Sequence, residues 1–79
     1  MVTVYRAHGL RIVIFVDDHE PAHVHVFGDG EAKINLVGGD GDPELIYAIG
    51  ITRAEIRRAT GVVREQQAYL LNRWSEIHG

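Results

Sequence analysis

The chain has 79 residues, 46% hydrophobic and 24% charged, with a net charge of −3, which suits a single globular domain over residues 1–79. Its lack of cysteine excludes disulfides, thiolate metal sites and cysteine nucleophiles, and favours a reducing cytoplasm. The negative charge disfavours non-specific nucleic-acid binding, and no apolar run is long enough to span a bilayer.

The first part of the chain alternates short strand-like segments with turns. Residues 2–6 predict a strand, followed by a turn at Gly9. The β-branched run 11–16 predicts the clearest strand of the chain. Residues 17–21 contain clustered acids and a proline, so they predict a loop.

Residues 23–27 and 31–36 both alternate apolar and polar side chains and predict a β-hairpin. A three-residue loop at 28–30 would place His25 opposite Lys33 and keep the two faces distinct. A two-residue loop would mix them, because a slip of one residue inverts every side chain. We therefore expect the three-residue loop. The apolar face would then carry Val24, Val26, Ala32, Ile34 and Leu36, and the other face His23, His25, Lys33 and Asn35.

The last third of the chain predicts one more strand and then helix. Residues 44–49 read as a strand, and Thr52 with Glu55 forms a capping-box pattern that predicts a helix start. Gly61 costs about 1 kcal/mol relative to alanine, so we expect one long helix with a weak point at Thr60-Gly61, with two helices as the alternative. An apolar stripe at helical spacing comprises Ile56, Ala59, Val63, Leu70, Trp74 and Ile77.

These elements predict an α+β fold. An antiparallel β-meander of four to five strands would be covered on one face by a long C-terminal helix. The apolar stripe of the helix would lie across the apolar face of the sheet, which leaves the histidine face outward.

The His-X-His pattern at His23 and His25 is the most concentrated chemical feature of the chain. On a strand the two imidazoles share one face, about 6.5–7 Å apart along the backbone. The preceding loop, with Asp17, Asp18 and His19, offers further ligands. His19, His23 and His25 would form a site for a divalent transition metal such as zinc.

A second hypothesis needs no metal. His23 and His25 would act as base and acid in phosphodiester cleavage, as in a ribonuclease, and Lys33 would hold the phosphate. An ordinary polar face or interface is the third reading, so enzymatic activity is left open.

Charge is unevenly distributed along the chain. Residues 53–64 hold four arginines against one glutamate, a local charge of +3 that leaves −6 for the rest. A solvated helix face explains such a run, and the alternative is a stripe that binds a partner or phosphate through Arg53, Arg57 and Arg64.

Several segments stand in an order that resembles a known family. The most specific is the block Pro21-Ala22-His23-Val24-His25-Val26. Together with residues 3–6, 9–12, 31–34 and the terminal helix carrying Trp74, it resembles the uncharacterised bacterial family called domain of unknown function 4160. Members often have a second proline where this chain has Ala22. A histidine-triad nucleotide hydrolase is excluded because Phe27 stands at the third histidine position.

The resemblance implies a stand-alone cytoplasmic bacterial protein, whose genes often neighbour another small gene in the manner of toxin–antitoxin pairs. So small a domain has a thin margin of stability, which also favours a protein partner or a homo-oligomer. The leading expectation is therefore a component of a toxin–antitoxin-type module that acts through a protein partner, with RNA as a further candidate partner and no membrane association.

Overall fold

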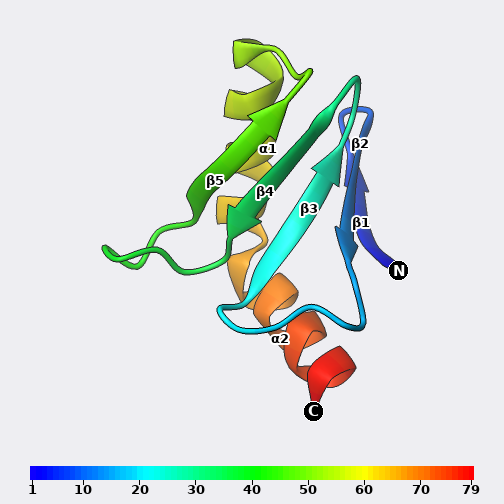
Figure 1. The fold of residues 1–79 in the computed structure, drawn as a ribbon. Helices are drawn as coiled ribbons and strands as arrows, with labels where there is room; N and C mark the ends of the chain where they lie inside the picture. Colours follow the sequence, from blue (N-terminus) through cyan, green and yellow to red (C-terminus); the bar gives the residue numbers. More distant parts are fainter.

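The computed structural model describes residues 1–79, which form a five-stranded antiparallel sheet followed by two helices (Figure 1). The strands lie side by side in chain order, which confirms the predicted α+β meander. They are β1 (Val2–Ala7), β2 (Leu10–Ile14), β3 (His23–Phe27), β4 (Glu31–Asn35) and β5 (Glu44–Ile49).

Strand β2 ends earlier than the β-branched run suggests. The sequence predicts strand to Val16, but a turn begins at Phe15. The Asp18 amide donates to the Phe15 carbonyl oxygen at 3.1 Å, and the Phe15 amide donates to the Asp18 carboxylate at 3.3 Å. Asp18 therefore redirects the chain, as aspartate commonly does in turns.

The β3–β4 hairpin has the predicted register. A three-residue loop places His25 opposite Lys33, and the Gly28 amide donates to the Gly30 carbonyl oxygen across it. The loop needs glycine at position 30, because a Cβ there would lie 2.1 Å from the Ile49 carbonyl oxygen. The apolar face is fully buried as expected: Val24, Val26, Ala32, Ile34 and Leu36.

Two helices follow the sheet, α1 (Arg53–Glu65) and α2 (Gln67–His78). The break between them falls at Gln66, not at Thr60-Gly61. Gly61 continues α1 without interruption. At the break the side chain of Gln67 donates to the carbonyl oxygens of Leu36 and Gly41, which ties the start of α2 to the loop before β5.

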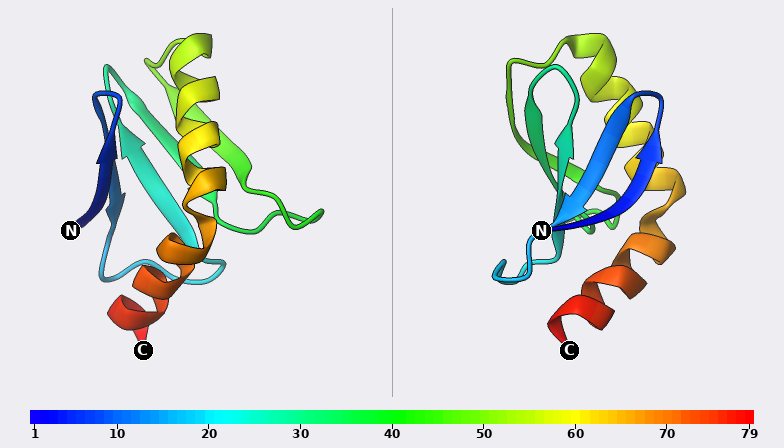
Figure 2. Two further views of the ribbon diagram at one scale, coloured as in Figure 1. Left: turned by 180° about the vertical axis from the view of Figure 1, so that it is seen from behind. Right: turned by 90° about the vertical axis from the view of Figure 1, so that its right-hand side faces the viewer.

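Both helices run along one face of the sheet, where the main core forms (Figure 2). The predicted stripe supplies the helical side of this core, with Ala59, Val63, Leu70 and Trp74 buried against the sheet. Neither helix combines the length and hydropathy that crossing a bilayer would require.

Helix α1 begins with the predicted capping box. Thr52 Oγ1 accepts from the Glu55 amide at 3.1 Å, and the Thr52 amide donates to the Glu55 carboxylate. This second hydrogen bond holds the pKa of Glu55 below its usual value. Only the ionised carboxylate makes the bond at full strength, so the cap depends on pH.

Glu55→Gln is expected to lower the free energy of unfolding at about pH 6 and to have little effect near pH 3. The pKa is lowered in the folded state, so the stabilisation is present above the unfolded-state pKa and is lost as the pH falls through the folded-state pKa. Urea unfolding of both proteins at the two pH values measures this. Glu65→Gln, at the other end of α1, is the control, and an equal loss at both pH values would contradict the role of the charge.

Candidate functional site

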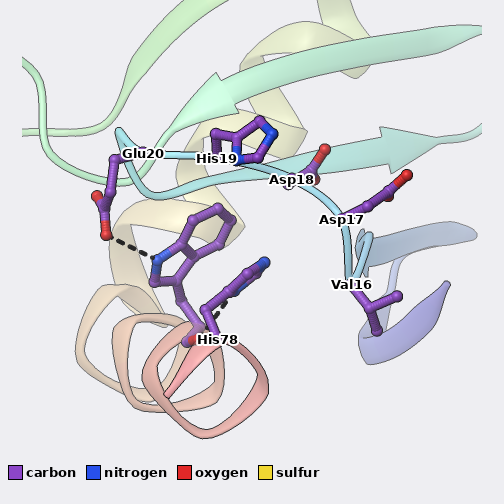
Figure 3. A pocket seen from close by; sticks show the side chains of 7 residues that line it. Val16, Asp17, Asp18, His19, Glu20 and His78 are labelled. Atoms are coloured by element: carbon purple, nitrogen blue, oxygen red, sulfur yellow. Dashed lines mark hydrogen bonds between the residues drawn. The ribbon is translucent and has the colours of Figure 1, made fainter.

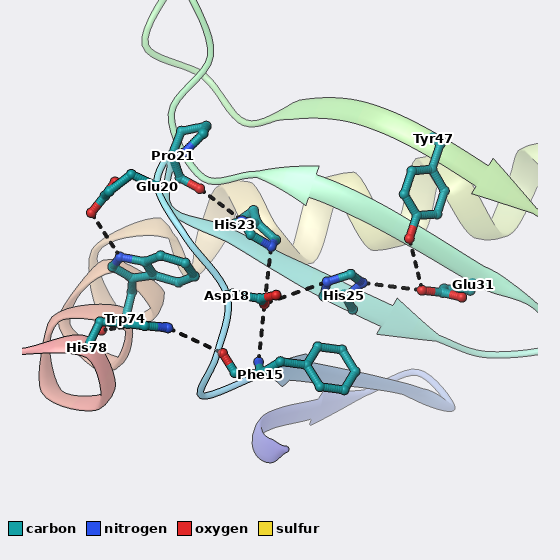
Figure 4. A network of polar contacts seen from close by, with 10 residues as sticks. All are labelled: Phe15, Asp18, Glu20, Pro21, His23, His25, Glu31, Tyr47, Trp74 and His78. Carbon is teal, nitrogen blue, oxygen red and sulfur yellow. Dashed lines mark hydrogen bonds and ion pairs between the residues drawn. The ribbon is translucent and has the colours of Figure 1, made fainter.

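His23 and His25 lie next to each other on the face of β3 that points away from α1 (Figure 4). Their ring centroids are 5.3 Å apart, in an edge-to-face arrangement. The sequence suggested that this face is open, but in the structure it is covered. His23 is only 5% exposed, and the side chain of His25 is 12% exposed.

The β2–β3 loop, residues 15–22, covers the two histidines. The Phe15 ring packs edge-on against His25, with centroids 4.7 Å apart. Val13, which pairs with His25 on the adjacent strand, is fully buried although it lies outside the main core. The histidines therefore belong to a second, smaller layer between the sheet and this loop.

Asp18 brings a carboxylate to both rings. Its Oδ2 atom lies 3.1 Å from His23 Nε2 and 3.7 Å from His25 Nε2. The same oxygen accepts from the Phe15 amide, so the turn that ends β2 also positions the carboxylate. The three side chains thus converge on one point from a strand and the loop before it.

The other nitrogen of each ring has a partner that can only accept. His23 Nδ1 donates to the Pro21 carbonyl oxygen at 2.8 Å, and His25 Nδ1 donates to Glu31 Oε2 at 3.2 Å. Both Nδ1 atoms must therefore carry the ring hydrogen. In the neutral rings, both Nε2 lone pairs then point toward the Asp18 carboxylate.

A further residue supports Glu31 from the neighbouring strand. The Tyr47 hydroxyl donates to Glu31 Oε2 at 3.1 Å (Figure 4). Partial burial and this hydrogen bond raise the pKa of Tyr47, so the phenol stays protonated and keeps donating. A continuous polar chain therefore runs from Tyr47 through Glu31 to His25 and on to Asp18.

This arrangement has the dimensions of a metal site. One ligand atom each from Asp18, His23 and His25 lie within 4.8 Å of one another. Ligands about 2.0–2.1 Å from a tetrahedral ion are about 3.3 Å apart. The Asp18–His23 and Asp18–His25 separations of 3.1 and 3.7 Å bracket this value. Small side-chain adjustments would thus suffice to surround an ion.

An open hollow of about 560 Å³ lies on the other side of the loop, between residues 16–20 and the end of α2 (Figure 3). Trp74 and His78 stack at 3.8 Å on its helical side, and Trp74 Nε1 donates to Glu20 at 3.3 Å. Trp74 also contacts the His23 ring, with centroids 5.2 Å apart. The hollow therefore meets the site at Asp18 and Trp74, which touch both.

Of the three histidines that the sequence predicts as metal ligands, the structure brings only His23 and His25 together. It brings Asp18, not His19, to the histidine pair, whereas His19 is exposed and lines the hollow. Lys33 lies opposite His25 in the strand register and is half-buried. The ammonium group of Lys33 makes no hydrogen bond or ion pair. The His25 side chain bonds to Glu31 instead.

The three arginines of the predicted binding stripe lie elsewhere. Arg53, Arg57 and Arg64 are exposed on α1, which packs on the opposite face of the sheet from the histidines. They therefore belong to a different surface from the Asp18–His23–His25 cluster.

Sequence reasoning missed Glu31 and Tyr47. The signal for Glu31 was present, since the hairpin register puts it on the same face as His25 and one diagonal step away. Tyr47 is positioned by the β4–β5 pairing, which has a bulge near Ile34, and the sequence gives no sign of that bulge.

Comparison with known proteins gives one match. A family model described as a domain of unknown function (DUF4160) matches residues 9–75. No curated protein and no solved structure matches the chain.

Proposed function

The chain belongs to the DUF4160 family, whose description names no activity, and from its site we propose that it binds a divalent transition-metal ion through Asp18, His23 and His25. The convergence of one carboxylate oxygen and two imidazole nitrogens within 4.8 Å carries this proposal.

The hydrogen bonds around the cluster support a metal over a simple polar contact. Histidines that bind metals almost always donate their other ring nitrogen to a carbonyl or carboxylate, which fixes the tautomer. His23 does so to the Pro21 carbonyl and His25 to Glu31. The Asp18 carboxylate oxygen faces both Nε2 atoms, so a cation bound between them would be attracted by all three groups.

The donor set also indicates which ions would fit. Two imidazoles and one carboxylate suit zinc and ferrous iron. The affinity of such a site for divalent ions rises from Mn²⁺ to Cu²⁺ and falls again at Zn²⁺. A structural zinc site has four protein ligands, whereas three leave a coordination position for water or another molecule. Asp18, with its 19% exposed side chain, is the most accessible of the three and borders the hollow.

Metal analysis of protein purified without a histidine tag tests the proposal. We expect about one equivalent of a transition metal, or uptake of one equivalent of Zn²⁺ by metal-free protein in a competition titration. Free Zn²⁺ at about 100 times its dissociation constant should raise the free energy of unfolding by about 2.7 kcal/mol. Absence of both uptake and stabilisation with Zn²⁺, Fe²⁺, Ni²⁺ and Mn²⁺ would refute the proposal.

Glu31→Gln is expected to lower the Zn²⁺ affinity about 10- to 100-fold, the usual loss when a residue that orients a histidine ligand is changed. The neutral amide orients the His25 ring less strongly than a carboxylate and makes its Nε2 less basic. Competition titration of the folded variant measures the change. Glu65→Gln is the control, and an unchanged affinity in Glu31→Gln would contradict the orienting role of Glu31.

Action through a protein partner, as in a toxin–antitoxin-type module, is the second candidate. It is supported by large apolar side chains exposed along β5, where the sheet ends. Co-expression with the neighbouring gene product tests it, and we expect the two proteins to copurify. Recovery of each protein alone would count against this candidate.

Metal-free phosphodiester cleavage receives less support from the geometry. General acid–base catalysis needs a ring nitrogen within hydrogen-bond reach of the substrate. His23 is almost fully buried, and all four nitrogens of the two rings face protein acceptors. Incubation of RNA with concentrated metal-free protein tests this activity, and we expect the RNA to stay intact.

A further inference from the structure

Strand β5 forms an edge of the sheet and exposes apolar side chains along most of its length. Ile49 is 66% exposed and Ile46 45% exposed, and Leu45 and Tyr47 are exposed as well. No residue from Leu45 to Ile49 is charged. Stand-alone proteins usually protect an edge strand with lysine, proline or a covering segment, because its free amides and carbonyls pair readily with another strand.

Strand β1, at the opposite edge of the sheet, carries some of this protection. Arg6 is the only exposed residue of β1. The Tyr69 hydroxyl from α2 donates to the Val4 carbonyl oxygen at 3.0 Å, and the Tyr5 and Tyr69 rings pack 6.1 Å apart. A side chain of α2 therefore occupies one carbonyl of the β1 edge, whereas no side-chain hydrogen bond reaches the backbone of β5.

The charges at the two ends of β5 are opposite in sign. Asp40 and Asp42 lie in the loop before it, which projects beyond the strand (Figure 1), and Glu44 is the first residue of β5. Arg53, Arg57 and Arg58 follow its end, on the first turns of α1. All six side chains are exposed.

This distribution is self-complementary in one orientation. When two β5 strands pair antiparallel about a two-fold axis, the acidic start of each lies beside the basic end of the other. Parallel pairing would set acid beside acid and base beside base. The central residues Leu45–Ile49 are uncharged and would meet uncharged residues in either case, so the charges select the antiparallel arrangement.

We propose that two copies of this chain associate through antiparallel pairing of their β5 strands, which joins the two sheets into one continuous sheet. This pairing places a second copy of the chain on β5, where the second candidate function would place a different protein, and it is independent of metal binding at Asp18, His23 and His25.

Sedimentation equilibrium of the whole chain tests the proposal. We expect a dimer at about 100 µM protein, a concentration that populates complexes of micromolar affinity. Ile46→Lys should give a monomer, because it places a charged lysine from each copy near the centre of an otherwise uncharged contact. Val16→Lys is the matched control, since Val16 is also an exposed apolar residue but lies in the β2–β3 loop, and it should remain dimeric.

A charge exchange separates this arrangement from other dimers. Asp42→Lys and Arg53→Glu should each weaken the dimer about tenfold, since each change disrupts two symmetry-related contacts. The double variant should recover most of the affinity. Circular dichroism checks that all variants fold.

Three results would overturn the proposal. They are a monomer at this concentration, a dimer that Ile46→Lys leaves intact, and a failure of the double charge exchange to restore affinity. If the chain alone is a monomer and its β5 strand binds a different protein, the dimer is ruled out and a heterologous partner is supported instead. Zn²⁺ uptake by the same samples reports separately on the metal site.

Discussion

Asp18→Ala is expected to lower the affinity for Zn²⁺ by more than about 100-fold, because the loss of a ligand should exceed the 10- to 100-fold loss seen for residues that only orient one. The change removes the one anionic group that both Nε2 atoms face, at 3.1 and 3.7 Å. It also removes the acceptor of the Phe15 amide, so the loop should become more mobile. Competition titration with a chromophoric chelator measures the affinity.

Two neighbouring residues provide controls for this experiment. Asp17→Ala removes an exposed acid one position away, and His19→Ala removes an exposed imidazole from the same loop. Both variants should bind Zn²⁺ with nearly the affinity of the parent chain. A larger loss in His19→Ala than in Asp18→Ala would mean that the loop rearranges to use the ligand set His19, His23 and His25.

Trp74→Ala is expected to lower the free energy of unfolding by about 3–5 kcal/mol, the usual cost of truncating a buried aromatic side chain. Trp74 is 4% exposed and belongs to the main core. It also contacts the rings of His23 and His78 and donates to Glu20. A small domain commonly has about 5–15 kcal/mol of stability in total, so this variant should be marginally folded.

Urea denaturation followed by circular dichroism measures this loss, since Trp74 is the single tryptophan and its fluorescence disappears with it. Trp74→Phe should cost less, because it retains an aromatic ring in the core and loses the indole hydrogen bond to Glu20. Ser75→Ala, on the exposed side of the same turn, is the control and should be nearly neutral. Equal stability of Trp74→Ala and the parent chain would show that the end of α2 does not pack as described.

The sheet could be predicted from the sequence because the alternation of apolar and polar residues is local and is repeated in neighbouring segments. The alternation in residues 23–27 and 31–36, with glycines between them, permits only one register that keeps the apolar side chains on one face. The same alternation placed His23 and His25 together. The capping box at Thr52 and Glu55 likewise marked the helix start from two residues alone.

The features that the sequence did not predict depend on contacts between distant segments. The break at Gln66 coincides with the hydrogen bonds of Gln67 to Leu36 and Gly41, whereas Gly61 was the visible weak point. Asp18 joins the histidines because the loop folds back over the sheet. Composition alone cannot distinguish such an acid from a solvated one such as Asp17.

The last turn of α2 braces the loop that carries Asp18. His78 Nε2 lies 3.2 Å from the Phe15 carbonyl oxygen, and Trp74 contacts His23. During synthesis the strand that bears His23 and His25 leaves the ribosome about fifty residues before this brace. Strands β1 to β4 can pair early, but the three ligands reach their final positions only after residues 74–78 have emerged. Metal loading would therefore follow the docking of α2.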